Sequence, residues 1–239
     1  MMLPSQLITH MYSFLSPAEQ LRMCSVSKVH RHALTSLDLT QPNEKLRITR
    51  VRFVLPSLPN IVTLNATYCS FGKDLFSCLP SLTHLKLDDV DLHLPESCDF
   101  SRVKSLTLTF DTLQHFTIVP KFTHLEYVLL HWKPICTYWY DQHYKPFKTK
   151  TLSFPYAKTI RLWYLRIEHL DAPVCNWLEC LDVTLNILDA PLLESFDVSC
   201  NHLQSAQSDE LVEKMENLAM EYKRQHKTCR VEFDSEVIP

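Results

Sequence analysis

Apolar residues recur seven times in one frame, L-x-x-L-x-x-L-x-L, between residues 58 and 198, and this repetition constrains the fold more than any single motif does. The seven sets are Leu58, Ile61, Leu64 and Ala66; Leu79, Leu82, Leu85 and Leu87; Phe100, Val103, Leu106 and Leu108; Phe122, Leu125, Val128 and Leu130; Phe154, Ala157, Ile160 and Leu162; Cys175, Leu178, Leu181 and Val183; and Ala190, Leu193, Phe196 and Val198. A single segment of this kind cannot bury its own apolar side, whereas parallel copies stacked side by side share one continuous core. The repetition therefore predicts a solenoid of parallel strands.

The third apolar position of each set falls at 64, 85, 106, 128, 160, 181 and 196. Four of the steps between these positions fall within the period of about 20–29 residues that is typical of leucine-rich repeats, which the body of the chain resembles. Cys69 and Asn201 stand where that family has its ladder residue. The resemblance implies an α/β leucine-rich-repeat domain over residues 41–239, with residues 44–55 as a helical return. We expect the coil that spans the short step from 181 to 196 to close with a turn and no helical return.

The long step from 128 to 160 contains an insertion over residues 133–156 that is dense in aromatic side chains, including Tyr138 and Trp139. Aromatic residues dominate the energetics of protein interfaces, so this loop is a candidate binding element. The alternative is an apolar flap that folds back on the edge of the solenoid.

Residues 205–234 are predicted to cap the C-terminal end of the solenoid. Leu211, Met215, Ala219 and Tyr222 fall on one stripe of a helix that we expect from Ser208 onward. Acidic residues in its first turn and basic residues in its last turn match the helix dipole, and the alternating segment RVEFD then predicts a final strand. We interpret the segment as a structural cap, the alternative being a partner-binding helix.

The composition excludes most classes of nucleotide-dependent enzyme. Gly72 is the only glycine among 239 residues, whereas phosphate-binding loops, dinucleotide fingerprints and nucleophile elbows need glycine where the backbone takes positive φ or approaches a ligand. The nine cysteines and 12 histidines do not show the spacing of a zinc site. We therefore expect reduced, mostly buried thiols, no metal, no cofactor and no catalytic residues.

The charge balance favours a protein partner. The net charge is −3, so the chain lacks the basic field that attracts nucleic acid or acidic membranes, and its short basic patches are interpreted as solvated faces. No apolar run approaches the roughly 20 residues that a membrane-spanning helix needs. We expect neither nucleic-acid nor membrane binding, and a cytoplasmic and/or nuclear location.

The N-terminal segment, residues 1–40, reads as three short helices. The letters SPAE at 16–19 are typical of a helix start, with Ser16 as the N-cap, Pro17 in the first helical position and Glu19 completing a capping box. Helices spanning fewer than about 40 residues bury too little surface to be stable alone. They are therefore expected to pack against the repeat domain that follows them and against a partner protein.

This segment resembles an F-box, the module with which substrate receptors bind the Skp1 adaptor of cullin-based ubiquitin ligases. The matching residues are Leu3-Pro4, Leu7, Ile8, Phe14-Leu15, the SPAE helix start, Leu21, and Val26 to Lys28. The resemblance implies that the chain is a non-catalytic substrate receptor of an SCF complex, holding a Skp1-like adaptor and, through it, a cullin scaffold. The adaptor contact is expected at Leu3, Pro4, Leu7, Ile8, Met11 and Leu15. Phe14, Leu21 and Val26 are expected to hold the helices together.

Residues that alternate with the buried positions point to the other face of the repeat sheet, because side chains alternate along a strand. We expect a client protein to bind this face and the aromatic insertion. The candidate client-binding residues are Tyr127, Leu129, His131, Arg161, Trp163, Asp182, Tyr138 and Trp139. The alternative is that Arg161 and Asp182 simply form a surface ion pair of small energetic value. For the whole chain, the alternative function is a non-catalytic leucine-rich-repeat scaffold outside any ubiquitin ligase.

Overall fold

The computed structural model describes most of the chain from residue 57 onward and parts of the N-terminal segment. The described residues are 10, 14–26, 32, 34–39, 51–53, 57–67, 69–71, 75–88, 90–92, 100–110, 119, 122–133, 147–200, 209–234 and 236–238. The chain forms two compact units. Unit 1 comprises Met1–Lys104 and Gln114–Lys121, and unit 2 comprises Ser105–Leu113 and Phe122–Pro239.

Unit 1 begins with a helix and continues as two small parallel sheets. Helix α2 (Pro17–Val26) lies beside the first strand, and a one-turn helix α4 (Leu75–Cys78) precedes β5. The first sheet has the order β1-β3-β5, with β1 (Ser36–Leu39), β3 (Thr63–Thr67) and β5 (His84–Asp88). The second has the order β2-β4-β6, with β2 (Val51–Phe53), β4 (Cys69–Phe71) and β6 (Asp91–Leu92).

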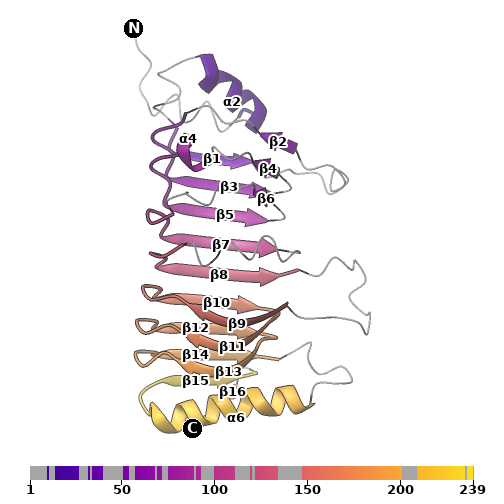
Figure 1. The fold of residues 1–239 in the computed structure, drawn as a ribbon, viewed down its shortest axis with the longest axis vertical. Coiled ribbons are helices and arrows are strands. Elements are labelled where there is room, and N and C mark those ends of the chain that lie inside the picture. Colours follow the sequence, from indigo (N-terminus) through magenta and orange to yellow (C-terminus); the bar gives the residue numbers. More distant parts are fainter. Residues whose placement is uncertain are drawn as a thin grey trace. The chain divides into compact units, whose positions relative to one another are not determined.

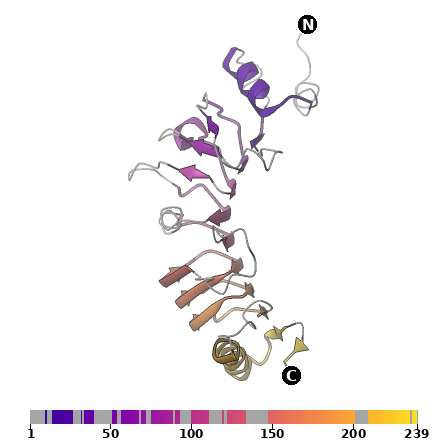
Figure 2. The same ribbon diagram turned by 90° about the vertical axis from the view of Figure 1, so that its right-hand side faces the viewer.

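Unit 2 is a solenoid of parallel strands in two sheets (Figure 1). Its first sheet runs in the order β7 (Ser105–Phe110), β8 (Tyr127–Trp132), β10 (Thr159–Trp163), β12 (Trp177–Leu181), β14 (Ser195–Ser199) and β15 (Arg230–Phe233), all parallel, with β16 (Glu236–Val237) added antiparallel. Its second sheet contains β9 (Phe147–Ser153), β11 (Leu165–Asp171) and β13 (Thr184–Asp189), which form a stack of their own in Figure 2.

The repeat positions predicted from the sequence are the core of both units. All seven expected strands are present, and the apolar positions of six sets are buried as predicted. Burial alternates along each strand, as in the iBiBi pattern of β3, β10 and β14, because successive side chains point to opposite faces of a sheet. The prediction of a parallel-strand solenoid is therefore confirmed.

The sixth repeat set begins one apolar position earlier in the chain than predicted. Ile160 lies opposite Leu178 and Leu162 opposite Cys180, so Leu178 rather than Leu181 holds the third repeat position. The set is therefore Ala172, Cys175, Leu178 and Cys180, all buried. With Phe196 opposite Leu178, the steps from 160 to 178 and from 178 to 196 are equal, in place of the unequal steps expected from 160 to 181 and from 181 to 196.

The coils of unit 2 return through strands, where the sequence had suggested only a turn or an insertion. β13 follows β12, and β9 occupies residues that were expected to belong to an aromatic loop. Phe147, at the start of β9, is buried with its ring 5.5 Å from that of Phe110 and 5.4 Å from that of Trp132. In unit 1, β2 lies within residues 44–55, the stretch predicted to be a helical return. Val51 and Phe53 pair with Cys69 and Phe71 of β4, so residues 51–53 form a strand and not a helix.

Helix α6 (Asp209–Gln225) caps the C-terminal end of unit 2, as predicted. Met215, Ala219 and Tyr222 are its buried residues. The Met215 sulfur accepts a hydrogen bond from the Leu185 N–H at 3.1 Å, and the Tyr222 hydroxyl donates to the Ala190 carbonyl. The expected final strand is β15. Ser208, the expected N-cap, lies outside the described residues.

Of the three N-terminal helices expected, only α2 is described from end to end. His10 and His32 are in helical conformation, and most of the residues of the first and third expected helices lie outside the described part of the chain. No helix among the described residues combines the length and apolar character that crossing a bilayer requires.

Candidate functional site

The outward face of the first sheet of unit 2 gathers the side chains with the clearest binding chemistry. Parallel pairing in register places equivalent outward residues of neighbouring strands side by side, about 4.8 Å apart. The central row consists of Thr107, Leu129, Arg161, Glu179, Asp197 and Glu232. Aromatic residues flank it, with Tyr127 and Trp177 on one side and His131 and Trp163 on the other.

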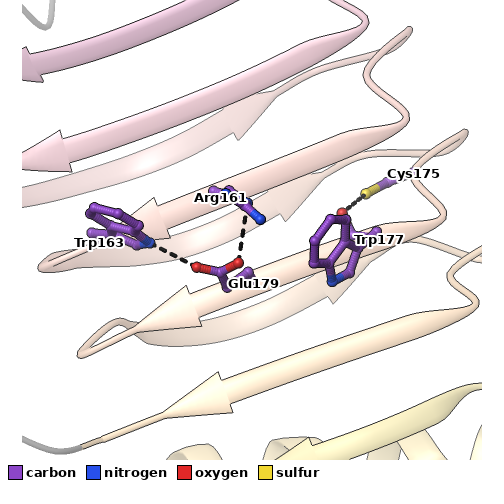
Figure 3. Close-up of polar contacts among 5 residues, drawn as sticks. All are labelled: Arg161, Trp163, Cys175, Trp177 and Glu179. Carbon is purple, nitrogen blue, oxygen red and sulfur yellow. Dashed lines mark hydrogen bonds and ion pairs between the residues drawn. The ribbon is translucent and has the colours of Figure 1, made fainter.

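Glu179 is the centre of a fixed polar cluster on this face (Figure 3). Its Oε2 lies 3.1 Å from the Arg161 Nε, and its Oε1 accepts a hydrogen bond from the Trp163 Nε1–H at 3.1 Å. Both carboxylate oxygens are thus engaged by residues of the neighbouring strand. The cluster holds the Trp163 ring and the Arg161 guanidinium in defined orientations.

Trp177 extends this cluster as an exposed aromatic surface. The central carbon of the Arg161 guanidinium lies 4.8 Å from the centre of the Trp177 ring, within the range of a cation–π interaction. Trp177 is 37% exposed, and His131 contacts Trp163 edge-on with ring centres 5.1 Å apart. Rings held in place but open to solvent can bind a partner with little loss of side-chain entropy.

Asp197 lies between two other carboxylates. It is opposite Glu179 on β12 and Glu232 on β15, and Glu232 forms an ion pair with Arg230. Burial and the negative charges of Glu232 and Glu179 raise the pKa of Asp197, while Arg230 partly offsets them. The face therefore ends in a row of three carboxylates, two of which have a cationic partner in the described structure.

Five of the predicted client-binding residues lie together on this face. Tyr127, Leu129, His131, Arg161 and Trp163 all occupy outward positions of β8 and β10 and are partly exposed. Tyr138 and Trp139 of the aromatic insertion lie outside the described residues.

Asp182 is not on this face, so its predicted place opposite Arg161 is wrong. The residue is 2% exposed and follows β12 with φ of 50°, and its N–H donates to the Ser199 carbonyl at 2.7 Å. The error follows from the register of the sixth repeat, which places Glu179 opposite Arg161.

Sequence reasoning missed Trp177 and Glu179, although a signal for them exists. Proline recurs at 155, 173 and 191, each time as the second residue of a tight turn before a strand. In each turn the backbone N–H of the fourth residue donates to the carbonyl of the first, as from Cys175 to Ala172 at 3.0 Å. Because proline presets the φ of this position, the even spacing of the three prolines marks the true register of the coils.

The start of helix α2 has the geometry predicted from the letters SPAE. The Ser16 N–H donates to Glu19 Oε2 at 2.8 Å, and the Glu19 N–H donates to Ser16 Oγ at 3.4 Å, which is a capping box. The hydrogen bonds from Ser16 lower the pKa of Glu19. This local prediction is confirmed because a capping box involves only residues within one turn of a helix.

The expected adaptor contact falls mostly on residues outside the described part of the chain. Leu3, Pro4, Leu7, Ile8 and Met11 are among these, whereas Leu15 is described and half-buried. Leu21 is buried, as expected for a residue that holds the segment together. Phe14 was expected to do the same, but it is 77% exposed, with its ring edge-on to His10 at 5.1 Å.

The cysteines are free wherever the structure describes their side chains, and the described residues contain no cluster of side chains suited to a metal. Burial raises the pKa of the Cys69 and Cys175 thiols to about 11. Burial, with the charges of Asp234 and Asp182, raises the pKa of Cys200 to about 12.

We expect Cys69, Cys175 and Cys200 to resist alkylation in the folded protein. The thiolate is the reactive form, and a raised pKa keeps each thiol protonated at mildly alkaline pH. Mass spectrometry after iodoacetamide treatment, with and without urea, measures this protection, and the less buried Cys78 serves as the internal control. Equal labelling of all four residues in the absence of urea would contradict the expectation.

Comparison with known proteins gives no relative. No family model matches the sequence, and no curated protein or solved structure matches it either. The function must therefore be argued from the residues and their geometry.

Proposed function

We propose that this protein is a non-catalytic substrate receptor of an SCF-type ubiquitin ligase. In this proposal the N-terminal segment binds a Skp1-like adaptor and, through it, a cullin scaffold, while the outward face of the first sheet of unit 2 binds a client protein. The observation that carries the proposal is the cluster of Arg161, Trp163, Trp177 and Glu179, because its side chains are oriented by one another yet remain partly exposed.

Tryptophan and arginine are the residue types most enriched at interface hot spots. Here two tryptophans and an arginine occur on two adjacent strands. The ion pair with Glu179 alone would be worth little, since both partners are partly exposed. Its value for recognition is geometric, because Glu179 holds a planar cation over the Trp177 ring and also fixes the Trp163 ring, and a partner can contact both rings.

The adaptor half of the proposal rests on the N-terminal segment. Helix α2 begins at a defined capping box, and the residue two positions before this cap, Phe14, exposes most of its ring. A phenylalanine left in water sacrifices favourable burial, so a partner that covers it gains apolar area. Leu15, one of the predicted adaptor contacts, is its neighbour in the chain.

We expect the double substitution Leu3→Ala/Pro4→Ala to abolish recovery of a Skp1-type adaptor in a pull-down. Each buried aliphatic side chain contributes about 1.5–3 kcal/mol, so losing two contacts reduces a micromolar complex below detection. Phe14→Ala is a second variant with the same expected direction. Because the ring is mostly exposed, this change is expected to leave the thermal unfolding midpoint almost unchanged.

Pro191→Ala/Leu192→Ala provides the matched control for this experiment. It removes the same two residue types from an exposed turn of unit 2, and adaptor recovery is expected to match that of the wild type. Unchanged recovery from Leu3→Ala/Pro4→Ala would remove the ubiquitin-ligase role. The repeats would then stand as a non-catalytic interaction scaffold.

A further inference from the structure

We propose that the carboxylate of Asp197, together with the exposed ring of Trp177, binds an arginine side chain presented by the client protein. This inference rests on the proposed function, since it names the chemistry that the outward face of unit 2 recognises. The occupant is a segment of a protein partner that carries an exposed arginine.

The row of carboxylates contains one member whose oxygens are open to a donor. Glu179 is engaged by Arg161 and Trp163, and Glu232 is engaged by Arg230. Within the described residues, the carboxylate of Asp197 has no hydrogen-bond donor and no ion-pair partner of its own. Three carboxylates against two guanidinium groups leave one negative charge on this part of the face.

The same face already shows how it holds a guanidinium. Arg161 lies over the Trp177 ring at 4.8 Å while its Nε lies 3.1 Å from a Glu179 oxygen. Asp197 occupies the next strand in the same row, and its neighbour Ser195 lies directly opposite Trp177. An incoming arginine can therefore combine the Asp197 carboxylate with the Trp177 indole, just as Arg161 of β10 combines Glu179 and Trp177 of β12. A lysine would form the ion pair but could not stack its cation as a plane on the ring.

The electrostatic environment of Asp197 favours a cationic partner. Burial and the charges of Glu232 and Glu179 raise the pKa of Asp197 more than Arg230 lowers it, so the surroundings on balance disfavour its negative charge. A guanidinium placed against the carboxylate relieves this repulsion. The small Ser195 and Ser199 side chains, which flank Asp197 on the outward side of β14, leave room for the approach.

The test is fluorescence anisotropy with a labelled octapeptide of alternating arginine and serine, measured against the full chain. We expect binding to the wild type that weakens at least about tenfold in Asp197→Asn, because a hydrogen bond to a charged group is lost. Glu216→Gln removes the same charge from the exposed surface of α6, and its affinity is expected to equal that of the wild type. The peptide with citrulline, the neutral analogue of arginine, is expected not to bind, and the lysine peptide is expected to bind more weakly.

Equal affinity of the wild type and Asp197→Asn would overturn the inference, as would equal binding of the citrulline peptide or no binding of the arginine peptide. Asp197→Asn is expected to fold normally, because it removes a repelled charge from a partly exposed position, and a thermal melt checks this.

The failure of this inference differs from the failure of the proposed function. If binding of the arginine peptide does not depend on Asp197, while altering Arg161 and Trp163 still removes co-purified proteins, the arginine chemistry is wrong and client recognition on this face is supported. If binding of the peptide depends on Asp197 but altering Arg161 and Trp163 leaves the co-purified proteins unchanged, the arginine site is supported and client recognition on this face is contradicted.

Discussion

Replacing Phe196 with alanine is expected to lower the free energy of unfolding by about 3–5 kcal/mol, as large aromatic-to-alanine changes in cores do. Phe196 is fully buried at the second position of β14, with its ring edge-on to that of Tyr222 on α6, ring centres 5.8 Å apart. The substitution leaves a cavity between the sheet and its cap. Because hydrogen bonds from the Leu185 N–H to the Met215 sulfur and from the Tyr222 hydroxyl to the Ala190 carbonyl hold α6 in place, the cavity cannot close fully.

Urea unfolding followed by circular dichroism measures this effect. Leu192→Ala, a change at an exposed position in the turn before β14, is the control and is expected to alter stability by no more than about 0.5 kcal/mol. Tyr222→Phe removes only the hydroxyl that donates to the Ala190 carbonyl, and it is expected to lower the free energy of unfolding by about 1 kcal/mol. A loss below about 1 kcal/mol for Phe196→Ala would show that α6 is not part of the cooperative core.

The double substitution Arg161→Glu/Trp163→Ala is expected to remove client proteins that co-purify with the wild type. The new carboxylate on residue 161 would face Glu179 directly, so the ion pair becomes a repulsion. Loss of the indole also removes the hydrogen bond to Glu179 Oε1. Hot-spot residues each contribute about 2 kcal/mol or more, so the combined loss corresponds to a decrease in affinity of about a thousandfold.

Affinity purification followed by mass spectrometry compares the co-purified proteins of the two forms. The matched control is Lys158→Glu/Tyr156→Ala, which reverses one charge and removes one exposed aromatic ring just before β10, away from the outward face. Its co-purified proteins are expected to match those of the wild type. If Arg161→Glu/Trp163→Ala kept them all, client binding would have to lie elsewhere on the chain.

The strands of the first sheet in each unit could be predicted because apolar periodicity reports burial directly. Leu64 and Ala66, or Ile160 and Leu162, occupy alternate positions, and alternation across a strand puts both on the buried face. The helix over 209–225 and the capping box at Ser16 were equally accessible, since both depend on residues within a few positions of one another. Outward candidates such as Arg161 and Trp163 followed from the same alternation.

The strands of the second sheet could not be predicted in this way. Burial along β11 and β13 does not alternate regularly, as the pattern BBeeie of β13 shows. A segment without a clear period of two looks like a loop until its neighbours are known. Phe147 for this reason falls within the predicted insertion 133–156, although its ring packs against those of Phe110 and Trp132.

The sequence alone therefore determined which side chains are buried in six of the seven repeat sets, because burial there depends on alternation within each strand. Only the tertiary structure decided which residues of neighbouring strands lie side by side, because register is set by the turns and by small residues such as Ala172 and Cys180 in the core. The pairing of Arg161 with Glu179, the burial of Asp182 and the position of Asp197 between two carboxylates all follow from that register. Had Leu181 rather than Leu178 lain opposite Ile160, Asp182 and not Glu179 would have faced Arg161.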